Sequence, residues 1–378
     1  MFEDKKVAAT WSAICEPGDM MAGYLRLALG FKDSLLAISS ETSIEELLRM
    51  LPTDEFRAPD FESALHNSME SWRRRLRVIN IESQLHRLHE LGGRLLTKSD
   101  PGWPIALSDL GTGEPPCLWV LGDQEVLQSQ QLVSVVGARI ASGYGLEVTS
   151  DMTQYLVAHG RTIVSGGALG IDARAHQTAI ESRGKTIAVM AGGLDSLYPS
   201  RNHELFENIK GTGLIISEVA IGVSPAKWRF LQRNRLIAAL GAATLVVEAG
   251  YRSGSINTAG HANALERPVG AVPGPVNSTR SAGCHRLIRE GRAELISTPS
   301  DLLELLGERV EVERQHYGLT DNQLRALDAV GFGKANLEEI AFSSGLSSND
   351  AVLTLRSLEN LGQIQRSSHI WQRTSNTL

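Results

Sequence analysis

The sequence has few cysteines, no long apolar segment and no excess of positive charge. Its three cysteines, Cys15, Cys117 and Cys284, lie far apart, without a C-x-x-C pair or a histidine at ligand spacing. This pattern indicates buried thiols in a reducing compartment and argues against a structural metal. No apolar segment approaches the roughly 20 residues that a membrane helix needs. The first residues, MFEDKK, lack the features of a signal peptide, so we expect a cytoplasmic protein that makes no contact with a membrane.

The net charge of −6 does not by itself indicate a nucleic-acid-binding protein. Any site for a polyanion must therefore be a local basic patch. The length of 378 residues is sufficient for two or three domains, and a hydrophobic content of 42% is ordinary for a globular protein.

Two nucleotide-binding fingerprints are missing. The stretch 165–170 reads SGGALG and does not match G-x-G-x-x-G, so we expect no NAD site. Gly184-Lys185-Thr186 resembles the end of a P-loop, but Ala179 stands where the first glycine is required. The tripeptide also leads into a predicted strand, whereas a P-loop leads into a helix. We expect neither a cofactor nor a metal.

From Leu132 onward, apolar segments rich in β-branched residues alternate with segments of helical period. This alternation predicts an α/β fold with a doubly wound, extended Rossmann-like sheet over 86–308, whose ligand lies beyond the carboxyl ends of the strands. The expected strands are 132–136, 162–164, 186–190, 214–217, 244–248 and 268–272, with 94–98 and 117–121 as extra edge strands. The expected helices between them are 144–159, 173–182, 203–209, 233–239 and 257–265.

The segment 1–85 is predicted to be a helical domain. Apolar residues at helical spacing cover 7–15, 20–29, 34–39, 43–50 and 61–91, and glycines and prolines interrupt them. A basic cluster, Trp72–Arg77, falls within the last of these helices. It could be a phosphate-binding face, but we favour a solvated helical face.

The chain ends in a polar linker, 309–316, and a small unit, 317–378. Capping boxes at Thr320 and Asn336, three helices (321–329, 337–343 and 349–361) and a possible hairpin at 363–371 predict a winged helix. This unit has six acidic and five basic residues, and its third helix carries only Arg356 as a base. We therefore favour a protein-contact role over duplex reading.

Loops of small residues follow several of the predicted strands. The loop 165–170 leads into a helix, and its free N–H groups are expected to bind an anion, most often a phosphate. Ser253, Gly254 and Ser255, which follow the strand ending at Glu248, form a second such turn. Asp172 and His176 could form an acid/base pair at the start of one helix. Because no nucleophile accompanies them, we favour structural roles, with Asp172 as the N-cap.

The most informative stretch is 221–235, IGVSPAKWRFLQRNR. It contains Lys227, Arg229, Arg233 and Arg235 without an acid, interleaved with Trp228 and Phe230. Cations that track phosphates and rings that stack on unpaired bases are what single-stranded nucleic acid requires. The alternative is a helix start whose two aromatic rings belong to the core. Arg139, just after the strand 132–136, is expected at the same carboxyl edge.

Several motifs in one order resemble the DNA-processing protein A family (DprA, also called Smf). They are VVGAR with SGYG, SGGALGIDARAH, AGGLDSLYP, F-x-x-RNRLIA, VVEA with SGSINTA, and VPGPV followed by GCHRLIREG. They extend densely from Leu132 to about Leu306. In one departure, Leu231 stands where the family usually has proline.

The resemblance implies a non-enzymatic protein that binds single-stranded DNA, dimerises and loads RecA recombinase onto incoming DNA during natural transformation. It also implies a sterile-alpha-motif-like (SAM-like) domain at the amino end and a winged helix at the carboxyl end. Gly166, Gly167 and Gly170 would shape the binding pocket. Carried over by motif, the residues that contact DNA would be Arg139, Lys227, Phe230, Arg233, Asn234 and Arg235.

Two other functions compete with this interpretation. A nucleotide-processing enzyme of the phosphoribohydrolase type would carry P-G-G-x-G-T, but the loop 165–171 lacks that proline and threonine. A protein scaffold that binds no nucleic acid would not need so many glycine-rich loops. We therefore expect no catalytic residues.

Overall fold

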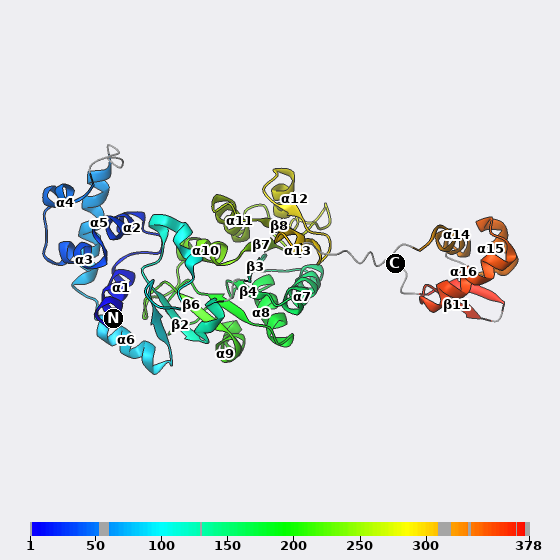
Figure 1. Cartoon of the computed structure of the whole chain (residues 1–378), viewed down its shortest axis with the longest axis horizontal. Helices are drawn as coiled ribbons and strands as arrows, with labels where there is room; N and C mark the ends of the chain where they lie inside the picture. The colour runs from blue at the N-terminus through cyan, green and yellow to red at the C-terminus, as the bar shows by residue number, and fades with distance from the viewer. Residues whose placement is uncertain are drawn as a thin grey trace. The chain divides into compact units, whose positions relative to one another are not determined.

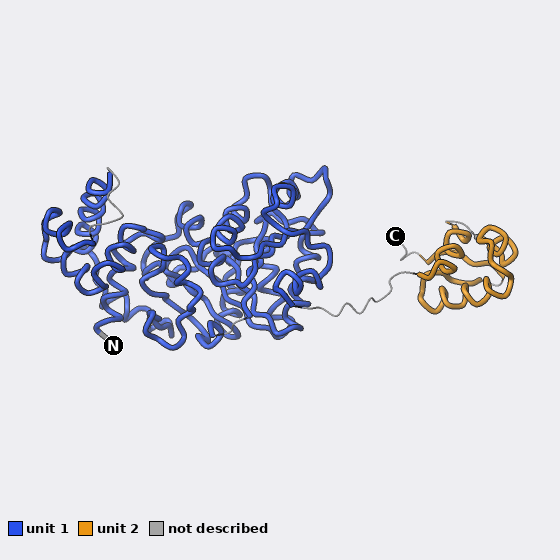
Figure 2. The backbone as a smooth tube through the Cα atoms, turned by 45° about the horizontal axis from the view of Figure 1, so that its top comes forward, with its two compact units in different colours: residues 1–310 blue, residues 311–378 orange. Residues whose placement is uncertain are grey.

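The computed structural model describes residues 2–52, 60–128, 131–308, 319–331, 334–367 and 369–374. The chain divides into two compact units, Met1–Val310 and Glu311–Leu378 (Figure 2). None of the helices within the described ranges is long and apolar enough to span a membrane.

A nine-stranded sheet forms the centre of the first unit (Figure 1). Its order is β1-β2-β6-β5-β4-β3-β7-β8-β9, with all pairs from β6 to β9 parallel and the pairs β1–β2 and β2–β6 antiparallel. The strand order reverses direction between β3 and β7, as in a doubly wound fold. The strands are β1 (Arg94–Leu96), β2 (Leu118–Gly122), β3 (Leu132–Val136), β4 (Thr162–Ser165), β5 (Thr186–Val189), β6 (Leu214–Ser217), β7 (Ala243–Val246), β8 (Val269–Ala271) and β9 (Glu294–Leu295).

The predicted strands correspond closely to those of the sheet. The bounds of β3 and β6 are as predicted. Both expected extra strands belong to the same sheet, but only β1 is an edge strand, because β2 lies between β1 and β6. Only β9 was not predicted, because two exposed residues carry no periodic signal. The sequence therefore contained the α/β architecture.

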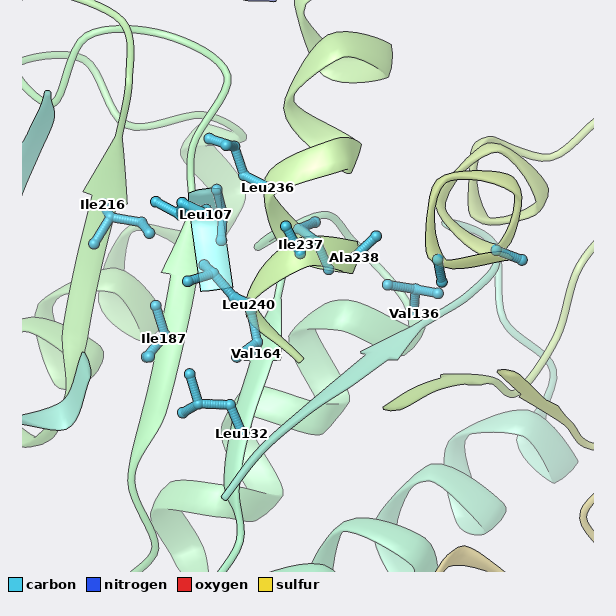
Figure 3. Close-up of a cluster of buried hydrophobic side chains, with 14 of the residues drawn as sticks. Leu107, Leu132, Val136, Val164, Ile187, Ile216, Leu236, Ile237, Ala238 and Leu240 are labelled. Atoms are coloured by element: carbon cyan, nitrogen blue, oxygen red, sulfur yellow. The ribbon is translucent and has the colours of Figure 1, made fainter. Parts of the chain in front are cut away.

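Helices cover both faces of this sheet. The helices α10 (Lys227–Leu240), α11 (Gly254–Ala264) and α12 (Ala282–Arg289) pack on one face, which Leu132, Val164 and Ile187 line (Figure 3). On the opposite face, Val133 and Ile163 contact a different cluster, because successive strand residues point to opposite sides. That cluster includes residues of α7 (Gly143–Ala158), α8 (Ile171–Glu181) and α13 (Asp301–Leu305); α9 (His203–Thr212) packs further along through Phe206 and Ile209.

Six helices precede the sheet. The first five bury a core of their own around Trp11, Leu47 and Trp72, whereas Ile81 and Leu88 of the sixth pack in a cluster with residues of the sheet. They also contact the sheet, since Ser12 Oγ donates to Glu218 O (2.7 Å) and accepts from Trp119 Nε1 (2.9 Å). The predicted domain boundary at 85/86 stays a prediction. The helices are α1 (Phe2–Ile14), α2 (Met20–Leu29), α3 (Phe31–Ser39), α4 (Ile44–Met50), α5 (Phe61–Leu76) and α6 (Ile81–Glu90).

One expectation for this region was wrong, and another holds only in part. The segment 61–91 is two helices, because Asn80 is extended and its side chain accepts from Ser83 N, which starts α6. In the basic cluster, Arg73 donates to Ile38 O and Thr42 O, and Arg75 donates to Ile14 O. These two guanidinium groups satisfy carbonyls near the ends of α3 and α1, whereas Arg74 and Arg77 are exposed, so the solvated face is confirmed only in part.

The second unit combines three helices with a three-stranded antiparallel sheet. Both predicted capping boxes are present, at Thr320 with Gln323 and at Asn336 with Glu339. The predicted linker 309–316 lies outside the described residues. The elements are α14 (Asp321–Val330), β10 (Lys334–Asn336), α15 (Leu337–Ser344), α16 (Ser348–Asn360), β11 (Ile364–Ser367) and β12 (Ile370–Arg373).

The first unit also holds the 3-10 helices η1 (Ile105–Gly113), η2 (Gln124–Gln128) and η3 (Ser200–Asn202).

Candidate functional site

The loops that follow β3 and β4 contact each other at the carboxyl edge of the sheet. Ile171 N donates to Ala138 O (3.2 Å), which joins the start of α8 to the loop after β3. Gly170 has φ +80, and a Cβ there would lie 2.3 Å from Ala138 O and 2.7 Å from Arg139 O. Only glycine permits this approach, so Gly170 sets the position of the backbone that carries Arg139.

The glycine loop 166–170 has its own anion. Asp172 Oδ2 accepts from Gly166 N (3.2 Å) and Ala168 N (3.4 Å), and the carboxylate also accepts from Gly137 N. Burial raises the pKa of Asp172, while Arg233 and these N–H donors act to lower it. The expected phosphate-binding loop with free N–H groups is therefore wrong at Gly166 and Ala168. Asp172 also lies within the first turn of α8, whose N-cap is Gly170.

His176 makes no catalytic pair with Asp172. Its ring is fully buried, and Nδ1 lies 2.7 Å from Thr186 Oγ1 of β5. Burial, with a smaller effect of Arg233, lowers the pKa of His176 to about 3, so the ring is neutral at pH 7. The buried ring of His176 therefore has the structural role that the sequence analysis favoured.

Acidification is expected to destabilise the protein through His176. The pKa of this group is lower in the folded state, about 3, than its ordinary value of 6.5, so the unfolded chain binds the extra proton between these values. Stability from this source is present above pH 6.5 and is lost as the pH falls toward 3. Between pH 7 and 5.5, His176 should lower the free energy of unfolding by about 1 kcal/mol.

Urea titrations of the wild type and of His176→Gln at both pH values measure this effect. The variant is expected to lose about 1 kcal/mol less on acidification, whatever its stability at pH 7. Equal losses in the two proteins would contradict the expectation.

The basic stretch begins a helix six residues earlier than predicted. Lys227 is the first residue of α10 and is exposed, and Trp228 is 43% exposed. Arg229 contacts the Trp228 ring and pairs with Glu16, with 3.1 Å between Nε and Oε2. Phe230 is half-buried. The first turn of α10 therefore presents a cation and an aromatic ring to solvent.

Three residues contact the Phe230 ring: Arg139 and Tyr198 from two loops, and Arg233 from α10 itself. The guanidinium carbon of Arg139, an exposed residue of the loop after β3, lies 5.1 Å from the ring centroid. The corresponding carbon of Arg233 lies 5.9 Å away. The ring of Tyr198, from the loop after β5, lies at 5.8 Å and is tilted by 56°. The structure thus brings Arg139 and Phe230 together as the sequence analysis expected, and it adds Tyr198.

The three predicted site residues that follow on α10 are buried. Arg233 donates to Gly166 O (2.9 Å) and to Val189 O, and burial lowers its pKa to about 10. Asn234 Nδ2 donates to Gly254 O (3.2 Å) and Asn257 Oδ1 (3.1 Å). These contacts connect α10 to the glycine loop and to the start of α11.

Arg235 is held between Glu218 and the carbonyl of Gly113. Its Nη1 and Nη2 lie 2.5 and 2.6 Å from the two oxygens of Glu218, and Nε and Nη2 donate to Gly113 O. Only 6% of Arg235 is exposed. Its guanidinium is engaged inside the protein and away from solvent.

The turn Ser253-Gly254-Ser255 lies beside the point where the strand order reverses. Ser253 caps α11 by accepting from Ser255 N (3.4 Å), and Gly254 is exposed. Nearby, Glu248 accepts from Ser142 N (2.9 Å) and Ser142 Oγ (2.5 Å), which joins the loop after β7 to the loop after β3. Asp172 thus holds the glycine loop after β4, and Glu248 holds the loop after β3 that carries Arg139.

Tyr198 is the surface residue that sequence reasoning missed. An aromatic residue before Pro199 in the loop after a predicted strand was an available signal, but a single ring outside a basic stretch attracts little notice. All three cysteines are free and buried, and burial raises the pKa of Cys117 to about 12. Across the described ranges, histidine, cysteine and acidic side chains form no cluster suited to a metal ion.

Together, the fold and the site define a Rossmann-like α/β protein whose glycine loop is closed by its own carboxylate and whose cations surround aromatic rings at the carboxyl edge. A sequence profile of the DNA recombination-mediator protein A family matches residues 94–307. The chain belongs to this family of recombination mediators, and the resemblance seen in the sequence is confirmed.

Relatives from three bacteria illustrate the match. The chain is 40% identical over 307 residues to the putative DNA processing protein DprA of Mycobacterium tuberculosis, covering 76% of this chain and 79% of that one. The X-ray structure of DprA from Streptococcus pneumoniae matches with a TM-score of 0.62 and 28% identity, over 79% of this chain and 95% of that one. A structure of Helicobacter pylori DprA, described for its single-stranded DNA binding mode, matches with a TM-score of 0.52 and 31% identity, over 57% of this chain and 95% of that one.

Proposed function

We propose that this protein binds single-stranded DNA at the carboxyl edge of its sheet, around Phe230. The observation that carries the proposal is the convergence of the exposed Arg139 with Phe230 and Tyr198 in a chain of net charge −6. Lys227 lies one helical turn before Phe230 on α10. Cations beside exposed rings suit phosphates and unpaired bases together, whereas a duplex would hide its bases.

The predicted site residues take different roles in this proposal. Arg139 and Lys227 meet phosphates, and the exposed Gly254 with Ser253 and Ser255 borders the path of the strand. Arg233, Asn234 and Arg235 position α10 against neighbouring loops, because their side chains already bond within the protein. Gly166, Gly167 and Gly170 shape the floor of the site. Gly167 has φ +64, and a Cβ there would lie 2.7 Å from the Phe206 ring.

Oligo-dT is expected to bind more tightly than duplex DNA of equal length, with an affinity that falls as salt rises. Arg139→Ala and Lys227→Ala should each weaken binding by about 1.5–3 kcal/mol, the usual range for a hydrogen bond to a charged group. Each should also flatten the plot of log affinity against log salt by roughly 0.7, one phosphate's worth. Fluorescence anisotropy titrations at several salt concentrations measure both quantities.

Lys185→Ala is the matched control. Lys185 immediately precedes β5 and so lies at the opposite, amino edge of the sheet, where its ammonium pairs with Asp123 at 3.4 Å. This variant should bind oligo-dT as the wild type does. Equal affinity of the wild type for both DNA forms, or an unchanged slope in both site variants, would refute the proposal.

We further propose that the protein acts as a cytoplasmic homodimer that loads RecA recombinase onto single-stranded DNA, in natural transformation or recombination. This assignment follows from membership of the recombination-mediator family. The six helices before the sheet would be the SAM-like domain. Sedimentation analysis and co-precipitation of RecA with the DNA-bound protein test the two partners. A monomer that does not retain RecA would contradict both.

The second unit would be a winged helix that contacts protein. Its charge, with six acidic and five basic residues in 317–378, does not favour duplex binding. Removing residues 311–378 should leave the affinity for oligo-dT within a few-fold of the full chain, because the two units are separately compact. A loss greater than tenfold in a truncated protein that still melts cooperatively would assign DNA binding to this unit.

We propose no catalytic activity. A nucleotide-processing enzyme on this fold would use the glycine loop for phosphate, but Asp172 accepts from the N–H groups of Gly166 and Ala168. His176 is buried and bonded to Thr186. Release of base or phosphate over many turnovers by the purified protein, and its loss in Asp172→Asn, would establish an enzyme.

A further inference from the structure

The environment of Phe230 leaves little room for a base on its own ring. The residue is half-buried. The guanidinium carbons of Arg139 and Arg233 lie 5.1 and 5.9 Å from its ring centroid, and the ring centroid of Tyr198 lies 5.8 Å away. A base inserted between two rings needs a separation of about 7 Å, twice the contact distance of carbon atoms. The rings of Tyr198 and Phe230 are too close for this, and their 56° tilt prevents a parallel stack of three.

Tyr198 has the surface that Phe230 lacks. It is 48% exposed, although one side of its ring contacts Phe230. Within the described residues, its hydroxyl has no hydrogen-bond partner. An exposed ring that packs against Phe230, which the exposed Arg139 also contacts, is suited to stacking on an unpaired base.

The loop that carries Tyr198 is held in place by neighbouring elements. Asp195 Oδ1 accepts from Gly222 N (2.8 Å), and Gly193 N donates to Val223 O (2.8 Å), so the loop is bonded to the segment before α10. Asn202 Nδ2, just beyond Tyr198, donates to Gly167 O (2.9 Å) in the glycine loop. The loop that carries the ring is therefore held in place, which lowers the entropy cost of binding.

We propose that Tyr198 is a nucleobase-binding residue and that Phe230 supports its ring from below. The strand's phosphates would meet Arg139 and Lys227 while one base stacks on the outer face of Tyr198. This inference rests on the proposed function and names the part of the site that recognises bases.

The test compares oligo-dT with an oligonucleotide of the same length that carries abasic sites, which keeps the phosphates and removes the bases. Tyr198→Ala should weaken binding of oligo-dT by about 5- to 150-fold, the range for one stacked base. It should leave both the affinity for the abasic strand and the salt dependence unchanged. Tyr198→Phe should bind both strands within about twofold of the wild type. Phe230→Leu should keep most of the preference for oligo-dT, because leucine still supports the tyrosine ring.

The other possible results distinguish failure of the proposed function from failure of the role of Tyr198. If the wild type binds neither strand, the proposed function fails. If the wild type binds with salt dependence and Tyr198→Ala is unchanged, only the role of Tyr198 fails. The inference is also overturned if Tyr198→Ala loses the same affinity for both strands. It is overturned as well if Phe230→Leu loses the preference for oligo-dT over the abasic strand while Tyr198→Ala keeps it. Thermal melts of Tyr198→Ala should stay close to the wild type, since the side chain is half exposed.

Discussion

Arg235→Met is expected to lower the free energy of unfolding by about 3–5 kcal/mol, because it leaves the buried carboxylate of Glu218 without its cation. The pair has bidentate geometry, with both Glu218 oxygens within 2.6 Å of the guanidinium. The same substitution removes the donors to Gly113 O. Urea titration at pH 7 measures the loss.

Two comparisons separate this cause from general damage. Adding Glu218→Gln to Arg235→Met should recover a large part of the loss, because no carboxylate then stays buried. Arg49→Met removes an exposed pair with Glu45 and should cost less than about 1 kcal/mol. The double variant is also expected to bind oligo-dT within a few-fold of the wild type, since Arg235 only positions α10. If the double variant folds but no longer binds, Arg235 contacts DNA directly.

Gly170→Ala should cost about 2–4 kcal/mol of stability and weaken DNA binding. The backbone at Gly170 has φ +80 and ψ −125, a combination that residues with a Cβ avoid. The added methyl would overlap Ala138 O and Arg139 O. Relief of this overlap must move the loop that carries Arg139, so affinity for oligo-dT should fall together with the melting temperature.

Gly211→Ala provides the comparison. Gly211 lies in α9 and has no positive φ, and a Cβ at this position would have no neighbouring atom within 4 Å. Alanine there should be neutral or add up to about 1 kcal/mol, as expected for a glycine in a helix. A Gly170→Ala protein that melts and binds like Gly211→Ala would disprove the close approach of the two loops.

The sequence was sufficient for the sheet because its strands are buried on both faces. Such strands are continuous apolar segments, as at 132–136 and 214–217, and need no tertiary information to be recognised. The first residues of the helices were harder to predict. The helix α10 begins at Lys227 without a side-chain cap, so no local signal marked its first residue. By contrast, Asn80 was a readable cap that divides 61–91.

The sequence was sufficient to identify the cations of the candidate site, but it was less informative about the role of each. Arg139 follows a strand, and Lys227 and Phe230 belong to a basic stretch, so pattern alone singled them out. The burial of Arg233 and Arg235 depends on partners 67 and 17 residues away along the chain, at Gly166 and Glu218. The position of Asp172 at the start of a helix predicts a cap, and nothing local reveals that a glycine loop folds over its carboxylate.

That carboxylate has a consequence for the protein among the solutes of a cell. Nucleotides and inorganic phosphate are abundant there, and an open glycine loop would attract them. To bind at this loop, such an anion would have to displace Asp172 from the N–H groups of Gly166 and Ala168 and then lie beside a buried negative charge. At this loop, small phosphates should therefore compete with DNA only through ionic strength.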